Sequence, residues 1–224
     1  MLARTNAMAP DSDTRDDDAL MRAYARGDAA AFETLYRRHR APLYRFVRRL
    51  LGTAHAAQAD EVFQDTWMKV IGARDRWAPQ GASFRTWMCT MAHHRAVDVL
   101  RRSGREVSTD AGGDGDDERE PWQPDSAAGA AWAGWPEPGA AGDPGELAFW
   151  RAAGSRLLGC LDELPLAQKT VFLLHHEDGQ TLDELARSLE VGFETAKSRL
   201  RYAMGKLRTC MGAYLPASAL RESA

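Results

Sequence analysis

A long stretch without any periodic apolar pattern divides the chain into two helix-forming parts. Residues 104–145 are rich in Gly, Pro, Ala, Asp and Glu, a composition that favours a flexible linker over packed structure. On both sides of it, apolar residues recur at three- and four-residue intervals, the spacing of amphipathic α-helices, and no segment shows the alternation of a half-buried strand. The sequence therefore predicts an all-α protein with two small helical domains joined by an acidic linker.

Four helices are expected in the first domain, residues 19–103. Asp28 can cap the first, Pro42 can begin the second, Gly52 can end it, and Ser83 can cap the fourth. Before this domain, residues 1–18 hold four acidic residues between Asp13 and Asp18 and are expected to form a disordered leader. The predicted helices cover residues 29–39, 42–51, 55–71 and 84–102.

The second domain, residues 146–215, ends in the pattern of a helix-turn-helix. Pro165 can open a helix that Gly179 ends, and Thr181 with Glu184 forms a capping box for the next helix. Val191 and Gly192 make a short turn before a longer basic helix, which is the order of elements in a DNA-binding helix-turn-helix. The predicted helices cover residues 147–161, 165–178, 182–189 and 194–211.

The last helix separates an apolar face from a polar one when its residues are placed at 100° steps. Ala196, Leu200, Ala203 and Leu207 fall on the inward side. The opposite side offers Arg, Lys, Ser and Glu, which are the side chains that read base edges and phosphates in the major groove. The residues expected to contact DNA here are Glu194, Thr195, Lys197, Ser198, Arg199, Arg201 and Tyr202.

Charge is distributed unevenly, although the formal net charge is only −3. Residues 187–208 hold six basic and two acidic residues, and residues 84–105 hold five basic and one acidic. Residues 106–146, between them, hold eleven acidic residues and one arginine. Because a phosphate backbone responds to local charge, both basic segments fit nucleic-acid contact.

The three cysteines, Cys89, Cys160 and Cys210, are far apart and form no CxxC pair. We expect reduced, mostly buried thiols with no disulfide. The histidine pairs, His93–His94 and His175–His176, point about 100° apart on a helix and are not expected to chelate a metal. No cofactor is expected, and without a signal sequence or membrane-spanning segment the chain is expected to be cytoplasmic.

Residues 164–203, from LPLAQKTVF to TAKSRLRYA, closely resemble the C-terminal domain of sigma-70 family factors. This resemblance implies that the last helix reads the minus-thirty-five element of a promoter. Phe193 and Glu194 stand where the family often has a small residue and Gly. The order of the two domains, with no room for another between them, resembles the extracytoplasmic-function (ECF) group.

Two segments of the first domain resemble the same family. DEVFQDTWMKV, residues 60–70, resembles the segment that docks on the coiled coil of the largest polymerase subunit. The helix that begins at Phe84 resembles the one that melts and holds the minus-ten element, with His94 where the family commonly has Asn. The residues implied for polymerase binding are Asp60, Glu61, Gln64, Asp65 and Trp67, and those for the minus-ten element are Arg85, His93, His94 and Arg101.

The expected function is therefore that of a sigma factor without catalytic activity, which binds core RNA polymerase and promoter DNA and is controlled by an anti-sigma factor. By resemblance, the acidic linker would thread the polymerase channel, and its tryptophans, Trp122, Trp132 and Trp135, either pack on the domains or dock on a partner. The main alternative is a stand-alone helix-turn-helix regulator, which would need a dimer for two half-sites. A hydrolase is a weaker alternative because no catalytic site is assembled.

Overall fold

The computed structural model describes residues 13–77, 83–102 and 144–214. The predicted linker, with its three tryptophans, lies outside these residues apart from its last two positions, which begin a helix. Within the described ranges the chain is helical and contains no strand, as the apolar spacing predicted.

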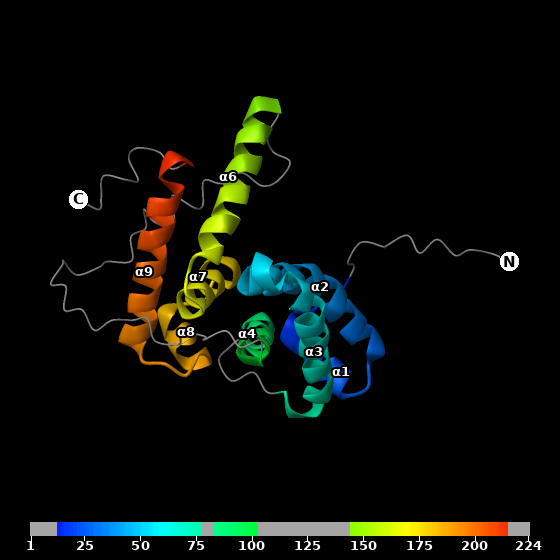
Figure 1. The fold of residues 1–224 in the computed structure, drawn as a ribbon. Helices are drawn as coiled ribbons and strands as arrows, with labels where there is room; N and C mark the ends of the chain where they lie inside the picture. Colours follow the sequence, from blue (N-terminus) through cyan, green and yellow to red (C-terminus); the bar gives the residue numbers. More distant parts are fainter. Residues whose placement is uncertain (1–12, 78–82, 103–143, 215–224) are drawn as a thin grey trace.

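The first helical group consists of α1 to α4 (Figure 1). Helix α1 spans Asp17–Ala25, α2 Ala29–Leu51, α3 Ala59–Gly72 and α4 Phe84–Arg102, with short 3₁₀ turns at Thr53–Gln58 and Arg74–Arg76. Apolar side chains from all four helices, among them Leu20, Leu35, Val62 and Met88, are buried in one core.

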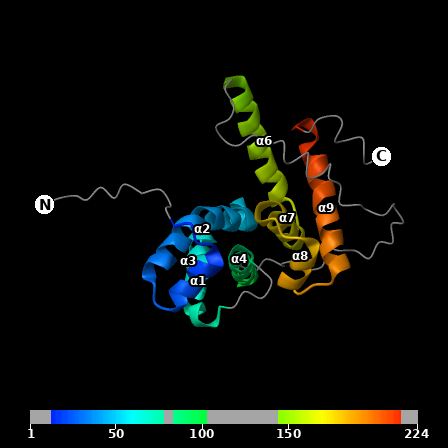
Figure 2. The same ribbon diagram turned by 180° about the vertical axis from the view of Figure 1, so that it is seen from behind.

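The second helical group consists of α6 to α9. Helix α6 spans Pro144–Asp162, α7 Leu166–Asp178, α8 Leu182–Ser188 and α9 Phe193–Met211, followed by a 3₁₀ turn at Gly212–Tyr214. Helices α6 and α9 pack on each other, while α7 contacts α9, α2 and α4. In both views α4 lies between α3 and the pair α7–α8 (Figures 1 and 2). The two groups meet along α4 and along α2, which contacts α6 and α7.

Most predicted caps are confirmed. Asp28 accepts a hydrogen bond from the Ala31 amide, and Ser83 accepts one from the Thr86 amide. Gly179 ends α7 in the left-handed conformation that glycine adopts without strain. The capping box of Thr181 and Glu184 is present, and its backbone hydrogen bond lowers the pKa of the Glu184 carboxyl.

Three predicted boundaries differ from the structure. The helix expected over 55–71 begins, as α3, only at Ala59, after the 3₁₀ turn Thr53–Gln58. Pro42 does not begin a new helix, because α2 is continuous through it. Proline removes only one backbone donor, and His39, Leu43 and Phe46 remain buried on one face across it, so packing holds the helix together. The predicted disordered leader, residues 1–18, includes residues that the structure places in a helix: Asp16 caps α1 through the Ala19 amide, and α1 begins at Asp17. Residues 1–12 of that leader lie outside the described residues.

Candidate nucleic-acid interface

Helix α9 has the two-sided character that its sequence predicts. Ala196, Leu200, Ala203 and Leu207 are all buried, and they pack this helix against α6, α7 and α8. Glu194 lies at the opposite side with its side chain 80% exposed, and Thr195 is exposed beside it. The α8–α9 pair therefore presents the first turns of α9 to solvent, where a recognition helix contacts base edges.

The exposed side of α9 holds its polar groups in local contacts. Lys197 Nζ lies 3.6 Å from Glu194 Oε2. The Arg201 guanidinium stacks over the ring of Tyr202, 5.0 Å from its centroid, and Ser198 Oγ donates to the Thr195 carbonyl at 3.0 Å. A weak surface ion pair and a stacked guanidinium are both easily exchanged for phosphate or base contacts.

Helix α4 turns two of its predicted DNA contacts toward the second helical group. Arg85 Nε lies 2.8 Å from Oδ1 of Asp178 at the end of α7. His93 Nδ1 lies 3.1 Å from the hydroxyl of Thr170, also on α7. His94 and Arg101 are exposed. The four predicted minus-ten residues thus fall into two sets, one in contact with α7 and one facing solvent.

The contact between the helical groups shifts the pKa values of groups on α4. Burial is the largest cause that lowers the His93 pKa to about 3, and the charges of His94 and of Arg199 on α9 lower it further. Burial raises the pKa of the Cys89 thiol, and the negative charge of Asp178 adds to that effect. Arg199 therefore lies close enough to α4 to act on His93 as well as being a candidate for DNA contact.

Acidification is expected to weaken the structure through His93. Its pKa in the folded protein is about 3, below the ordinary 6.5, so folding favours the neutral ring and this contribution is present above pH 6.5 and lost as the pH falls below it. Between pH 7.5 and 5.5 the loss should be roughly 1 kcal/mol. Thermal unfolding followed at both pH values measures it. The variant His93→Gln should lose that part of the pH dependence of stability. If the variant and the wild type lose the same stability between the two pH values, His93 is not the group responsible.

The acidic residues predicted for polymerase binding lie on α3, where two of them are held by a buried arginine. Arg95 of α4, only 9% exposed, places Nε 2.5 Å from Asp65 Oδ2 and Nη2 2.6 Å from Glu61 Oε1. Asp60 and Gln64 are exposed on the same helix. The position of Arg95 within the apolar stripe of α4, which sequence alone leaves unexplained, is accounted for by this double ion pair.

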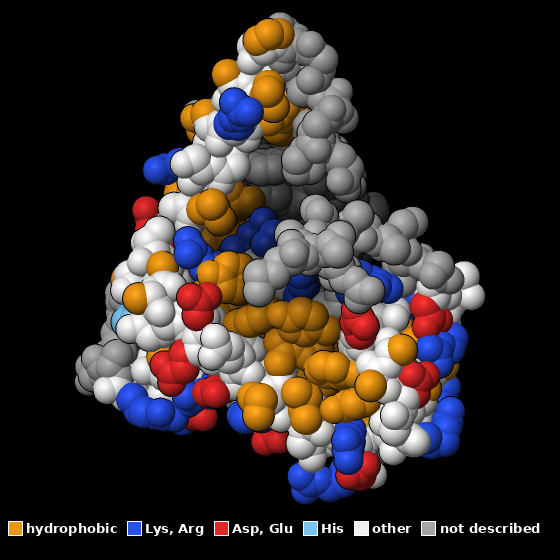
Figure 3. All heavy atoms as spheres, turned by 90° about the vertical axis from the view of Figure 1, so that its right-hand side faces the viewer, with side chains coloured by type: hydrophobic (Ala, Val, Ile, Leu, Met, Phe, Trp, Pro, Cys, Tyr) orange, Lys and Arg blue, Asp and Glu red, His pale blue; other side chains and the backbone are white. Residues whose placement is uncertain are grey.

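Trp67, which the family resemblance implies for polymerase binding, lies in the core of the first helical group. It is 5% exposed, and its ring packs against those of Phe32 and Tyr36 of α2, with ring centroids 5.8 and 4.9 Å away. The apolar side chains of α2 and α3 that do reach the surface include Tyr36 at 36% and Met68 at 64% exposed. Hydrophobic side chains gather across the middle of the face that contains the first helical group (Figure 3).

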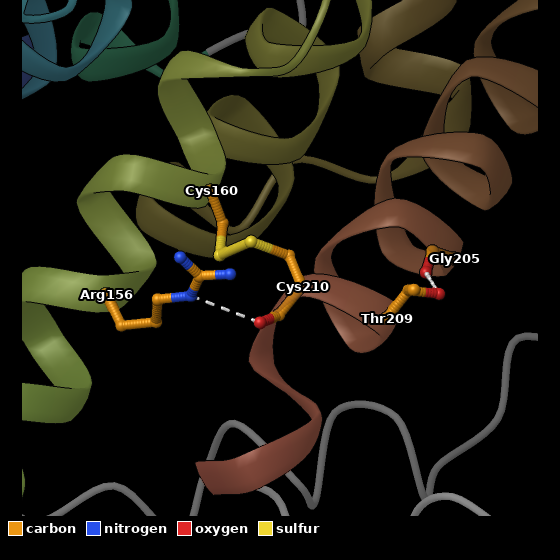
Figure 4. Close-up of a disulfide and its surroundings, with 5 residues drawn as sticks. All are labelled: Arg156, Cys160, Gly205, Thr209 and Cys210. Atoms are coloured by element: carbon orange, nitrogen blue, oxygen red, sulfur yellow. Dashed lines mark hydrogen bonds between the residues drawn. A yellow bond between two sulfur atoms is a disulfide. The ribbon is translucent and has the colours of Figure 1, made fainter.

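The expectation of three reduced cysteines is wrong for two of them. Cys160 of α6 and Cys210 of α9 form a disulfide, with Cα atoms 5.9 Å apart (Figure 4). Their separation of 50 residues carries no pairing signal, whereas the packing of α6 on α9 brings them together. Arg156 Nε also donates to the Cys210 carbonyl at 3.2 Å, as Figure 4 shows. Cys89 is a buried free thiol, as predicted.

Among the described residues, no group of three or more His, Cys, Asp or Glu side chains is placed to hold a metal ion. The same residues include no helix with the length and apolar character needed to cross a bilayer.

Fold and surfaces together define an all-helical protein with a helix-turn-helix at its C-terminal end. Two family models match the chain: Sigma-70 region 2 over residues 35–106 and Sigma-70, region 4 over residues 160–209. The ECF RNA polymerase sigma factor SigK of Mycolicibacterium vanbaalenii is 32% identical over 199 residues, covering 89% of this chain and 91% of that protein. SigK of Mycobacterium ulcerans is 30% identical and covers 89% and 96%.

Solved structures of similar fold include CnrH in complex with the cytosolic domain of CnrY, with a TM-score of 0.54, 23% identity and coverage of 88% and 97%. Another is the sigma factor RpoE in complex with the anti-sigma factor NepR from Bartonella quintana. Its TM-score is 0.51 and its identity 19%, and the match covers 81% of this chain and 96% of that one. The chain belongs to the sigma-70 family, in its ECF group, and is a sigma factor that directs promoter-specific transcription.

Proposed function

We propose that the two helical groups divide promoter recognition between them: α9 reads the minus-thirty-five element, and α4 captures the melted minus-ten strand. The observation that carries this proposal is the two-sided α9: Ala196, Leu200, Ala203 and Leu207 are buried, while Glu194 and Thr195 are exposed at its start. Lys197, Ser198 and Arg201 supply donors for bases and phosphates on the same side. On α4, His94 and Arg101 are exposed and are the proposed contacts to the melted strand. They follow the partly buried Trp87 at intervals of seven residues, so the three lie along one side of the helix.

Docking on core polymerase is proposed for α3. The buried Arg95 of α4 forms ion pairs with the carboxylates of Glu61 and Asp65. Both acidic side chains remain about half exposed, at 53% and 42%. Met68 lies one turn further along α3 at 64% exposure. An apolar side chain beside oriented carboxylates suits a partner helix that carries basic residues. Met68, and not Trp67, is the anchor that this surface offers.

We further propose an anti-sigma factor as the partner that controls this chain. The support is that both similar structures are described as complexes, CnrH with CnrY and RpoE with NepR. CnrH and RpoE are both less than 25% identical to this chain in sequence, so the proposal names the class of partner and not a particular protein.

The test begins by adding the protein to core polymerase and mapping transcript starts on genomic DNA. At the strongest start, the variant Lys197→Ala, Ser198→Ala, Arg201→Ala should weaken protection of the upstream element by on the order of 100-fold, because each lost contact costs about 1–3 kcal/mol. Footprinting measures this protection.

Lys206→Ala with Arg208→Ala is the matched control, since it also removes two positive charges, but from the last turns of α9. It should leave most of the upstream protection in place. Equal footprints for the wild type and the triple variant would refute the assignment of α9. Sequence-specific binding to duplex DNA without polymerase would favour the stand-alone regulator.

A further inference from the structure

The end of α7 is acidic and lies against the start of α4. Asp178 has a side chain that is only 1% exposed, yet it is surrounded by polar partners. Besides the Arg85 guanidinium, the Thr86 hydroxyl donates to its Oδ2 at 3.0 Å and the Gln180 amide donates to the same atom at 2.7 Å. A buried carboxylate that meets a cation and two donors is stabilised there, and it would be costly to leave unpaired.

Glu177 completes this contact from the neighbouring position. Its carboxylate lies 2.5 Å from Nη1 of Arg49 on α2, and its main-chain carbonyl accepts a hydrogen bond from Nη2 of Arg85. Two consecutive residues of α7 therefore engage two arginines of the first helical group. Further along the same pair of helices, Thr170 contacts His93.

These contacts occupy two of the four residues that the family resemblance implies for the minus-ten element, which the proposed function assigns to α4. Arg85 and His93 are candidate minus-ten contacts, and in this structure their polar atoms face α7. Carboxylates bind an arginine with the same charge-assisted hydrogen bonds that a phosphate would accept. A strand of DNA and the end of α7 thus compete for one surface of α4.

We propose that Glu177 and Asp178 form an intramolecular latch, which holds the free protein closed and masks the minus-ten surface of α4. The latch rests on the proposed function for its consequence, since it assumes that Arg85 and His93 contact DNA. The existence of the latch does not depend on the proposed function, because the closed arrangement can be measured without DNA. Binding to polymerase and promoter, with the two helical groups on separate DNA elements, would require the latch to open.

Single-molecule energy transfer tests the latch in the full-length protein. Dyes are attached through Met68→Cys and Lys206→Cys, two exposed positions on different helical groups; Cys89 is buried and the other two cysteines are bonded to each other. The labelled protein without further substitutions should lie almost entirely in a high-transfer population, with a small low-transfer population. Adding Asp178→Asn should raise the low-transfer population about tenfold, as expected for loss of a hydrogen bond to a charged group.

Asp183→Asn is the matched control, because it removes one negative charge from an exposed side chain of α8. It should leave the transfer unchanged. Arg49→Gln is a second variant that removes no buried group, and it should shift the populations in the same direction as Asp178→Asn. Low transfer in the labelled protein without further substitutions, or variants of Asp178 and Arg49 that both behave like the control, would overturn the latch.

A pool of random-sequence single-stranded 20-mers separates the latch from the function that it masks. If α4 binds single strands, Asp178→Asn should bind the pool more tightly than the wild type and Asp183→Asn should not. An opened latch without tighter binding would leave the closed state established and refute the assignment of α4 to DNA. Tighter binding without opening would refute the latch.

Discussion

Reduction of the Cys160–Cys210 disulfide should lower the melting temperature of the second helical group by roughly 10–20 °C. The bond closes a loop of 50 residues, and loops of this length restrict the unfolded chain enough to stabilise the folded state by about 2–4 kcal/mol. The group that it serves is small, so each kilocalorie corresponds to a large change in melting temperature. Circular dichroism at 222 nm, recorded with and without a phosphine reductant, measures the change.

The variant Cys160→Ala, Cys210→Ala provides the first control. It should melt near the temperature of the reduced wild type and should not respond to the reductant. Cys89→Ala is the second control: its thiol is buried and unpaired, so this variant should keep the full response. If the wild type melts at the same temperature with and without the reductant, the disulfide does not stabilise the helical group.

The elements that sequence predicts well are those whose signals are local. Thr181 and Glu184 satisfy each other's backbone groups within four residues, so the capping box is visible in the sequence and present in the structure. Ala196 and Leu200 are one turn apart, and their shared burial follows from helical geometry. The helix-turn-helix surface could be predicted because one helix carries both the apolar residues and the polar ones.

The features that sequence missed join residues that are distant along the chain. Arg95 lies in an apolar stripe of α4, and only the packing of α3 on α4 shows that Glu61 and Asp65 pair with it. The spacing of Trp67 fits a buried residue, but only the packing of α3 on α2 shows that its partners are the rings of Phe32 and Tyr36. The contact of Asp178 with Arg85 spans two helical groups, which no local pattern can reveal.

Gly52 marks the junction of the two helical groups, and its replacement by alanine should lower the free energy of unfolding by about 3 kcal/mol. Its φ of 71° and ψ of −176° belong to a region that essentially only glycine occupies, where other residues are strained by about 1–3 kcal/mol. A Cβ atom would also collide with the Asp162 carboxylate. That carboxylate accepts hydrogen bonds from the Thr53 amide at 3.0 Å and hydroxyl at 2.8 Å, and both would be displaced. Urea unfolding measures the loss.

Gly72→Ala is the matched control, since a Cβ there meets nothing within 4 Å and the variant should be as stable as the wild type or slightly more stable. A double-mutant cycle with Asp162→Ala divides the effect of Gly52→Ala between backbone strain and collision. If collision contributes, Gly52→Ala should cost less when Asp162 is already alanine, because the carboxylate is gone. Additive losses would assign the whole effect to backbone strain. A Gly52→Ala variant as stable as Gly72→Ala would mean that this junction does not constrain the chain.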